Sequence, residues 1–489
     1  MAHEESAEVI VAILMKDCEG PNHKTKESVP VFSRKGLGDQ TNTRLGGHRG
    51  NGDAGSEPVP CEAASPISVN DGTRALTVNL MERVCEPSNL NRAYKCVKGN
   101  KGAPGIDGMT VETAPDWLKK HKERLIQSLL DGSYQPSPVR GVDIPKPNGG
   151  TRELGIPTVV DRIVQQAILQ ILGPIFEPTF SPYSYGFRLG RSAKDAVTQA
   201  RKFVAEGKEF VVDMDLEKFF DRVNHDILMS RLARRIADKR LLRIVRRFLQ
   251  AGIMKDGVVV EREKGTPQGG PLSPLLSNIL LTDLDEELTR RGHSFCRYAD
   301  DCNIYVGSQA AAERILASMT RWLSEKLHLQ VNAKKSAAAP TFTRKFLGFR
   351  LTSGGRIQIA TESRERLRKK LIELTKRRTP RNIEVIAKSL SPVLRGWGNY
   401  FRIAEGRSFF REIDQWLRRR LRAIRLHQCK RAYARAKFLM ELGVPPAASW
   451  KLAKSGKGMW RLSCSPPAHQ GMNTQWFERI GLFSLETLD

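Results

Sequence analysis

Hydrophobic and polar positions along the chain follow two different periods, and this pattern predicts a mixed α and β fold. After about residue 76, apolar residues recur every three to four positions, which is typical of amphipathic helices. We expect the clearest of these helices at 117–130, 161–176, 192–205, 225–235, 239–251, 275–289 and 311–327. Strand-like runs lie between them, and they predict β-hairpins at 139–156 and 295–306.

A further apolar run, Phe210–Asp215, predicts a buried strand that ends in a turn. It carries two carboxylates, Asp213 and Asp215, although buried strands do not carry carboxylates without compensation. Because side chains alternate along a strand, both carboxylates lie on the same face. Asp215, at the strand end, is the better candidate for a metal ligand, and Asp213 is its rival.

Two adjacent carboxylates, Asp300 and Asp301, lie in the middle of the half-apolar hairpin 295–306. Like charges at that distance repel each other, and a bound divalent cation would remove the repulsion. A solvated Asp-Asp turn is the alternative interpretation. The rest of the chain has to decide between the two.

The other hairpin and a Gly-rich segment offer groups that suit a nucleotide. Lys146 and Arg152 flank the Pro-Asn-Gly-Gly turn of 139–156, where two cations suit a triphosphate. Two ordinary exposed cations are the alternative. The Gly-rich run 264–274 opens a helix, which allows close approach of the backbone to a nucleotide.

Charge is distributed unevenly along this chain of 489 residues and net charge +27. Residues 1–75 carry eight Lys/Arg against eleven Asp/Glu, are rich in Gly, Ser and Pro, and are expected to be largely disordered. Residues 361–440 hold 23 Lys/Arg against seven Asp/Glu. Such an excess favours a polyanionic partner, most simply nucleic acid, over a merely solvated basic face.

Two regions offer specific contacts for RNA. A Gly/Lys loop at 98–110 has backbone N–H groups and cations for a phosphate backbone, and aromatics alternate with cations at 394–402. The same rings would also serve as ordinary helix core. The predicted RNA-binding residues are Lys98, Lys101, Arg395, Trp397, Tyr400, Arg418, Arg419 and Arg420.

The eight cysteines form no Cys-x-x-Cys pair, so neither a zinc site nor a disulfide framework is indicated. The apolar runs are expected to fall short of a membrane span. Acidic residues precede the apolar segment 9–14, which is the wrong flank for a secretory signal. We expect a cytoplasmic protein that contacts no membrane and, when it acts on DNA, is associated with the bacterial nucleoid.

Several motifs occur in the order of reverse-transcriptase sequence blocks. They are Lys146 with Arg152–Pro157, Ser184–Arg188, Asp215 with Phe220 and Asp221, Gly265–Gly270, and Tyr298–Asp301. Together with Arg395–Phe401, they make the chain resemble group II intron-encoded proteins, the reverse transcriptase/maturases. The resemblance covers about residues 76–440.

The resemblance implies an α+β fold of the right-hand polymerase type. Fingers and palm with an antiparallel sheet would occupy 76–350, and an α-helical thumb, the maturase or X region, would occupy 351–440. Residues 441–489 are expected to form a small, partly ordered tail, a candidate DNA-binding remnant, and 1–75 an N-terminal extension. Many relatives add an HNH endonuclease, which we do not expect here.

The resemblance also implies a role for individual residues. Asp215, Asp300 and Asp301 would bind two catalytic Mg²⁺ ions, for which Mn²⁺ could substitute. Lys146 and Arg152 would bind the incoming triphosphate, Phe220 would exclude a ribose 2′-OH, and Gln268 would contact nucleotide and template. Asp213 would be structural, Phe346–Phe349 would grip the primer, and Lys335 is a candidate for protonating pyrophosphate.

The implied function is RNA-directed DNA synthesis combined with maturation. The protein would bind its own group II intron RNA, assist splicing, and copy the intron into cDNA from a primer at a DNA target, consuming dNTPs. It would act as a monomer or a dimer. Two alternatives remain open: a splicing maturase without polymerase activity, and a reverse transcriptase of a retron or diversity-generating element.

Overall fold

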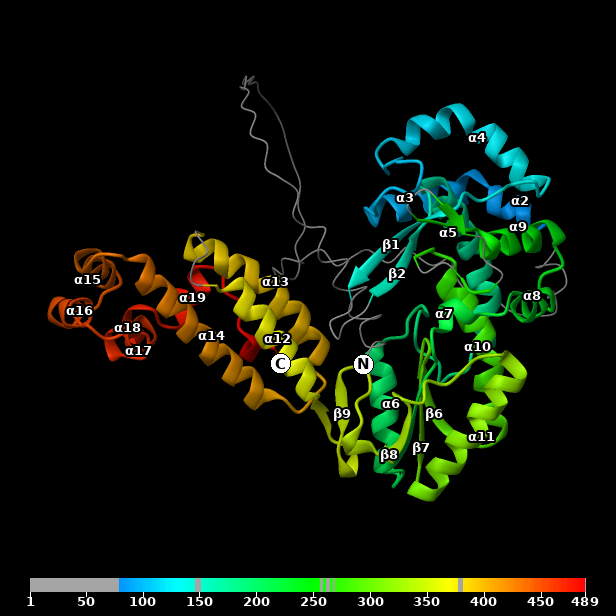
Figure 1. The fold of residues 1–489 in the computed structure, drawn as a ribbon. Helices are drawn as coiled ribbons and strands as arrows, with labels where there is room; N and C mark the ends of the chain where they lie inside the picture. Colours follow the sequence, from blue (N-terminus) through cyan, green and yellow to red (C-terminus); the bar gives the residue numbers. More distant parts are fainter. Residues whose placement is uncertain are drawn as a thin grey trace, which may run out of the picture.

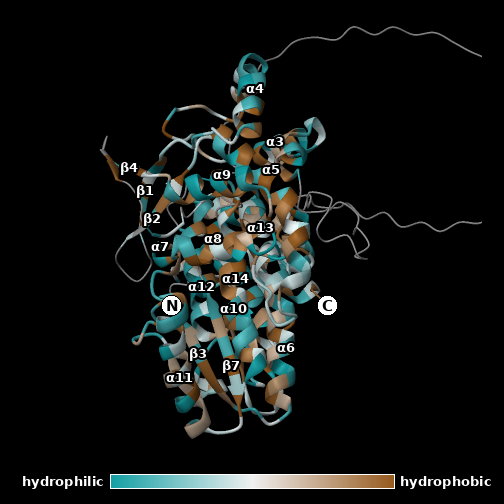
Figure 2. Ribbon diagram, turned by 90° about the vertical axis from the view of Figure 1, so that its right-hand side faces the viewer, coloured by the Kyte–Doolittle hydropathy of each residue, from teal (hydrophilic) through white to brown (hydrophobic). Residues whose placement is uncertain are grey.

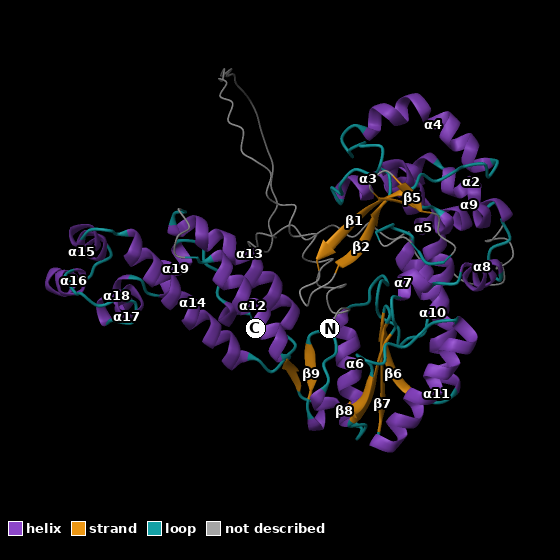
Figure 3. Cartoon of the chain, in the orientation of Figure 1, coloured by secondary structure: helices purple, strands orange, loops and turns teal. Residues whose placement is uncertain are grey.

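The computed structural model describes residues 79–145, 151–255, 258–260, 264–266, 269–376 and 381–488. The predicted N-terminal extension lies outside these residues. The described chain forms a mixed α/β part and a helical part that lie side by side (Figure 1). All strands belong to the mixed part or to the junction between the two, and the part from α12 onward is helical (Figure 3). This arrangement confirms the predicted order of fingers, palm and helical thumb.

The fingers combine a helical cluster with a small sheet. The helices are α2 (Leu80–Cys85), α3 (Pro87–Gly99), α4 (Ala114–Leu130), α5 (Val159–Phe176), α8 (His225–Ala233) and α9 (Lys239–Gln250). The strands are β1 (Val139–Pro145), β2 (Thr151–Ile156), β4 (Ile253–Lys255) and β5 (Val258–Val260), in the order β2-β1-β4-β5. The predicted hairpin is thus present as β1 and β2, which pair antiparallel, whereas β1 pairs with β4 in parallel.

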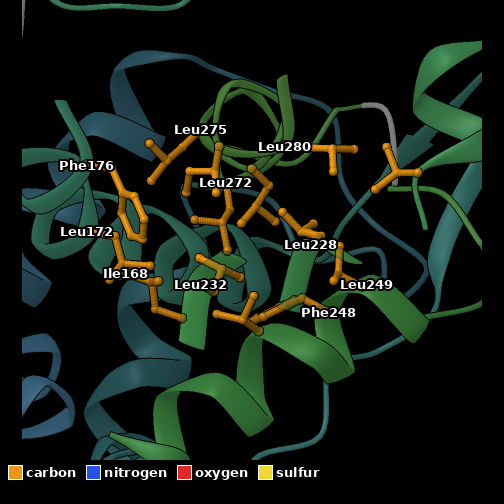
Figure 4. Packing of buried hydrophobic residues seen from close by; sticks show 14 of the residues in the cluster. Ile168, Leu172, Phe176, Leu228, Leu232, Phe248, Leu249, Leu272, Leu275 and Leu280 are labelled. Carbon is orange, nitrogen blue, oxygen red and sulfur yellow. The ribbon is translucent and has the colours of Figure 1, made fainter. Parts of the chain in front are cut away.

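Helix α5 forms the centre of the fingers core. Its Ile168, Leu172 and Phe176 meet leucines of α8, α9 and the palm helix α10 (Ser273–Arg290) in one apolar cluster (Figure 4). The segment Val159–Thr179 is long and apolar enough to cross a membrane, contrary to the expectation from sequence. However, 67% of its most apolar 18-residue stretch is buried within the fold. Its hydrophobicity is therefore used in packing against the rest of the protein.

The palm is a four-stranded sheet with strand order β6-β7-β3-β8. Its strands are β3 (Phe210–Asp215), β6 (Ser294–Tyr298), β7 (Asp301–Val306) and β8 (Ala337–Pro340), and all neighbours are antiparallel. Helices α10 and α11 (Gln309–Leu327) pack on one face and α6 (Ala193–Ala205) on the other. The hydrophobic strands β3 and β7 lie between α6 and α11 (Figure 2), so the strand predicted at 210–215 is buried as expected.

One strand was not predicted, and one strand-like segment was interpreted wrongly. Strand β8 has the sequence Ala-Ala-Ala-Pro, which has no β preference, and it forms because β3 offers its edge. The segment 345–349, which is strand-like in its sequence, is mostly a tight turn, with Leu347 and Gly348 at positive φ (51° and 80°). Only β9 (Phe349–Leu351), which follows this turn, is extended, and it pairs with β10 (Ile357–Ile359).

The thumb is built on three long helices, α12 (Thr361–Leu374), α13 (Ile383–Phe401) and α14 (Arg407–Gln428). The short helices α15 (Ala432–Glu441), α16 (Pro446–Ala453), α17 (Met459–Leu462), α18 (Pro466–Gly471) and α19 (Thr474–Arg479) follow. The expected partly ordered tail is therefore incorrect. Trp476, Phe477 and Leu485 are buried in the same core as α13 and α14, because the tail supplies the apolar surface that covers those helices.

Candidate active site and nucleic-acid interface

Three predicted carboxylates lie at the same end of the palm sheet. Asp215 is the last residue of β3 and is the cross-strand partner of Asp301, the first residue of β7. Asp300 directly precedes Asp301 in the turn that joins β6 to β7. Asp215 and Asp300 are buried, with 6% and 4% of their surface exposed. Asp215 and Asp301, 86 positions apart in sequence, thus meet because β3 and β7 are neighbours.

The turn that carries Asp300 has a strained backbone and a close neighbour. Ala299 has a φ of 57°, in the left-handed region that residues with a Cβ rarely adopt. Gly186 packs directly on this turn, since a Cβ at position 186 would lie 2.2 Å from the Ala299 nitrogen. The Ser184–Arg188 motif therefore supports the turn by close packing.

The backbone and carboxylate of Asp215 are held by the segment that leads into β8. The Asp215 N–H donates to Ser336 Oγ at 2.9 Å, and the Lys335 ammonium lies 3.3 Å from Asp215 Oδ2. The resemblance singled out Lys335, but nothing in the sequence marked Ser336. The contact exists because β8 pairs with β3.

Asp213, the rival candidate, lies two residues deeper on the same strand and has a structural partner. The Arg344 guanidinium donates to Asp213 Oδ2 through Nε at 2.9 Å. Burial raises the pKa of Asp213 above its ordinary value, and Arg344 offsets part of that rise. The prediction that Asp213 is a structural residue agrees with this ion pair.

The donor set at the strand ends suits a hard divalent cation but is not drawn together in this structure. Asp215, Asp300 and Asp301 offer carboxylate oxygens, the ligands that Mg²⁺ prefers. Among the described residues, however, no three acidic, histidine or cysteine side chains are grouped closely enough to hold a metal ion. The Asp215 carboxylate instead faces an ammonium group. The residues fit the chemistry of the ion, and the metal site stays a prediction.

The predicted sugar gate and the Gly-rich segment lie in direct contact. Phe220 is half-buried on the short helix α7 (Phe219–Arg222), with its ring 5.3 Å from that of Phe219. Its carbonyl accepts a hydrogen bond of 2.6 Å from the Thr266 N–H. A Cβ at Gly265 would lie 2.8 Å from the same carbonyl oxygen, so the glycine is needed for this approach.

The second part of the Gly-rich segment packs against the fingers. Gly269 has a φ of 123°, and a Cβ there would lie 2.6 Å from the Gly155 carbonyl oxygen of β2. A Cβ at Gly270 would lie 2.4 Å from Gln165 Oε1 of α5. The segment is thus wedged between α7 and the strand that bears Arg152. Glycines that the sequence assigned to a nucleotide serve close packing between fingers and palm.

Three of the four predicted nucleotide-binding side chains cannot be placed. Lys146 and Gln268 lie outside the described residues. The backbone of Arg152 is in β2, opposite Ile144, while its side chain lies outside the described part. Their predicted contacts with a triphosphate and a template stay predictions.

The Gly/Lys loop is anchored to the start of α5. A Cβ at Gly105 would lie 2.7 Å from the Cα of Thr158, and Arg162 Nη2 donates to the Ala103 carbonyl at 2.8 Å. Lys98 and Lys101 are exposed at the rim of this loop. The glycines therefore fix the loop, and the two lysines are available for a phosphate backbone.

The predicted RNA-stacking rings of the thumb pack inside the protein. Trp397 is half-buried, with its ring 4.5 Å from that of Phe401 and 5.8 Å from that of Phe409. The Tyr400 hydroxyl donates to the Leu347 carbonyl at 2.9 Å. These rings join α13 to α14 and to the turn at 346–349, and RNA contact by either stays a prediction.

The predicted RNA-binding arginines also have partners within the thumb. Arg418, with 14% of its side chain exposed, lies 3.8 Å from Glu486, and the Arg419 guanidinium lies 4.1 Å from the centre of the Trp460 ring. Arg420 donates to the Thr375 carbonyl at 3.2 Å. Arg395 is exposed above the ring of Phe483, at 5.0 Å. Exposed cations such as Lys369 and Lys370 of α12 are therefore better placed for RNA.

Comparison with known proteins gives two family matches within the chain. Residues 144–351 match the family "Reverse transcriptase (RNA-dependent DNA polymerase)", and residues 364–443 match "Group II intron, maturase-specific domain". The first match contains the three palm carboxylates and Phe220. The second covers most of the basic thumb.

Individual proteins are also similar to this chain. Protein YkfC of Escherichia coli (strain K12) is 35% identical over 297 residues, 53% of this chain and 78% of YkfC. The group II intron-encoded protein LtrA of Lactococcus lactis subsp. cremoris is 39% identical over 196 residues, 40% of this chain and 32% of LtrA. The putative COX1/OXI3 intron 1 protein of Saccharomyces cerevisiae is 32% identical over 272 residues, 54% of this chain and 31% of that protein.

Proposed function

Because the chain belongs to the family of group II intron-encoded reverse transcriptase/maturases, we propose that it copies RNA into DNA and binds the intron RNA that encodes it. The observation that carries the proposal is the pairing of Asp215 with Asp301 across β3 and β7, with Asp300 beside them. Two carboxylates facing each other at a strand end suit shared metal ligands.

The reaction joins a primer to a dNTP. The primer 3′-oxygen attacks the α-phosphorus, a new P–O bond forms, the bond to the β-phosphate oxygen breaks, and pyrophosphate leaves. Divalent ions, most simply Mg²⁺, would when bound lower the pKa of the 3′-OH and neutralise charge on the phosphates. Asp215, Asp300 and Asp301 would hold them, and Lys335, beside Asp215, is the candidate proton donor to pyrophosphate.

The elements around the carboxylates would hold the nucleotide. Phe220 and the Gly-rich segment are tied together through the Thr266–Phe220 hydrogen bond, so the gate and the nucleotide-facing loop form one unit. Arg152 belongs to β2, which packs on that loop at Gly155, and Lys146 directly follows β1 in sequence. A dNTP bound there would contact the palm carboxylates, the gate and the finger cations together.

Primer extension tests the polymerase. Pure protein with Mg²⁺, poly(rA), oligo(dT) and dTTP should incorporate dTMP, and Asp215→Asn should abolish incorporation. Because Asn is isosteric with Asp, it removes the charge and leaves the packing of β3 intact. No incorporation by the wild-type protein would refute the proposed polymerase activity.

The basic thumb supports the second half of the proposal. A group II intron RNA is a polyanion, and the thumb region 361–440 carries a large excess of cations. The maturase-specific match covers the same region. Addition of the protein to its intron transcript should therefore promote splicing at low Mg²⁺ concentration, and copying at a DNA target, as in retrohoming, should require both activities.

A splicing maturase without polymerase activity is the second candidate function. It is favoured by one observation, the contact of Asp215 with Lys335 in place of a closed carboxylate cluster. Protein that promotes splicing of its intron but incorporates no dNTP would establish this alternative. The maturase-specific match argues against a retron or diversity-generating element.

A further inference from the structure

One arginine next to the carboxylate turn is completely buried. Arg297 is the fourth residue of β6, two positions before Ala299, and none of its surface is exposed. Burial of a guanidinium costs several kcal/mol unless it is paired and hydrogen-bonded. Its partners therefore indicate what the arginine does in this position.

The Arg297 guanidinium joins the turn to helix α10. Its Nε and Nη2 donate to the two carboxylate oxygens of Asp285 at 2.7 and 2.6 Å. Its Nη1 donates to Asn278 Oδ1 at 3.0 Å and to the Ala299 carbonyl at 2.8 Å. Asp285 and Asn278 are each 1% exposed. Burial alone would lower the pKa of Arg297, but the Asp285 carboxylate raises it above its ordinary value, so the arginine stays charged.

The same network reaches the turn from its other side. Asn278 Nδ2 donates to the Gly186 carbonyl at 2.9 Å, and Gly186 is the residue that packs on Ala299. The backbone of Arg297 is also bonded to this segment, since the Tyr185 N–H donates to its carbonyl at 2.8 Å. Ala299 is thus enclosed between α10 and the segment 184–186, both of which are bonded to Arg297.

This enclosure fixes a backbone conformation that alanine does not favour. A residue other than glycine rarely adopts the left-handed region, because its Cβ lies too close to the following carbonyl oxygen. The hydrogen bond from Arg297 to the Ala299 carbonyl orients the peptide that links Ala299 to Asp300. The direction of that peptide sets where the Asp300 and Asp301 side chains point.

We propose that Arg297 and Asp285 are a positioning pair that aims Asp300 and Asp301 at the catalytic metal ions. The pair acts through the backbone of Ala299 and touches neither substrate nor metal. The proposal rests on the polymerase function proposed above. It explains why a charged pair is kept inside the palm, where an apolar pair of the same volume would be no less stable.

Conservative variants test the pair. Arg297→Lys keeps the charge but loses the planar fork, so it cannot hold both Asp285 and Ala299. We expect kcat for primer extension to fall about 10- to 100-fold, as for other residues that orient metal ligands. The Mg²⁺ concentration for half-maximal activity should rise, while Kd for primer–template stays unchanged. A purely structural arginine would lower Tm without changing the Mg²⁺ requirement.

Two further variants keep the test decisive. Asn278→Ala leaves the Arg297–Asp285 pair intact and removes one hydrogen bond to Arg297 and one to Gly186. It should therefore fold even where Arg297→Lys does not. The rise in its Mg²⁺ requirement should be smaller. Arg231→Lys is the matched control. Arg231, on α8, lies 2.6 Å from Asp283, which belongs to α10 as Asp285 does. The Arg231→Lys variant should change neither kcat nor the Mg²⁺ requirement.

The results distinguish a failure of the proposed positioning role from a failure of the proposed polymerase function. Wild-type kcat and Mg²⁺ dependence in folded Arg297→Lys, or in Asn278→Ala where the lysine variant does not fold, would overturn the positioning role. An equal shift in Arg231→Lys would overturn it as well. Absence of incorporation by the wild-type protein would instead contradict the proposed function itself.

Discussion

At the residue scale, two of the three predicted metal ligands, Asp215 and Asp300, are almost completely buried. Asp300 is 4% exposed and belongs to a turn enclosed by neighbouring segments. A buried carboxylate that merely stabilised the fold would not need a second one beside it. The juxtaposition therefore favours a catalytic role and gives a direct prediction.

Asp300→Ala should abolish DNA synthesis, because one of three expected metal ligands is lost, and should leave binding of intron RNA nearly intact. The basic thumb region, 361–440, does not include the turn at 298–301. Primer extension and filter binding on the same preparation measure the two activities. If both are lost together, Asp300 is a folding residue.

Phe220→Ala should admit ribonucleotides. Its half-buried ring belongs to α7, and its backbone carbonyl accepts a hydrogen bond from the Gly-rich segment. Removal of the ring would leave room for a 2′-OH. We expect the preference for dTTP over UTP, as a ratio of kcat/KM, to fall at least about tenfold. Phe220→Tyr keeps the ring and should preserve the preference. Unchanged sugar selectivity in the alanine variant would contradict the gate.

At the element scale, the conformation of the β6–β7 turn depends on a neighbouring segment. Gly186→Ala should destabilise the palm by roughly 1–3 kcal/mol, because its Cβ would collide with the backbone of Ala299. Gly173→Ala is the matched control, since a Cβ in that part of α5 meets nothing within 4 Å. It should be neutral or stabilise the helix by up to about 1 kcal/mol. Thermal unfolding, together with primer extension, compares the two variants. Equal Tm values for Gly186→Ala and Gly173→Ala would contradict the close contact between Gly186 and Ala299.

The start of α5 should make stability depend on pH. Burial raises the pKa of Asp161 to about 6, although Thr158, Tyr134 and Ser137 donate hydrogen bonds to it. The folded protein therefore holds this proton more tightly than the unfolded chain, whose carboxyl titrates near 3.8. Stability due to Asp161 is greatest below pH 4 and falls as the pH rises through 6, by roughly 3 kcal/mol in total.

Asp161→Asn has no such proton to lose. As the pH rises from 4.5 to 7.5, the unfolding free energy of the wild type should fall relative to that of Asp161→Asn. Urea titrations at both pH values measure it. A difference that does not change with pH would place the pKa of Asp161 near its ordinary value.

The elements also show where local sequence was a sufficient guide. The strand at 210–215, the hairpin at 139–156 and the long helices have strong periodicity and were predicted correctly. Strand β8 and the short helices α16–α19 were missed, because alanine- and proline-containing segments carry little periodicity. Their structure follows from the surfaces they cover, the edge of β3 and the apolar faces of α13 and α14.

At the scale of the whole molecule, the thumb combines a packed interior with a cationic exterior. Several arginines predicted to contact RNA are engaged with Trp460, Thr375 and Glu486. Their replacement would therefore disturb the thumb itself. Replacement of exposed lysines on α12 tests RNA binding separately from the stability of the thumb.

Lys369→Glu with Lys370→Glu should weaken binding of intron RNA and reduce the slope of log Kd against log salt by about 1.5, at unchanged Tm. Arg419→Ala should lower Tm instead, because the guanidinium stacks on Trp460. Lys119→Glu with Lys120→Glu on α4 changes the net charge equally and is the control. An effect of the same size there would mean that RNA binding depends on total charge.

The sequence by itself determined the palm carboxylates, the order of the motifs, the basic thumb and the α+β class. These features are local: each is written in a few consecutive residues or in the charge of a region. Only the tertiary structure decided that Asp215 faces Asp301, that Gly186 and Arg297 enclose the turn between them, and that residues 441–488 complete the thumb core. Such contacts join residues distant in sequence, and no pattern within one segment specifies its partner.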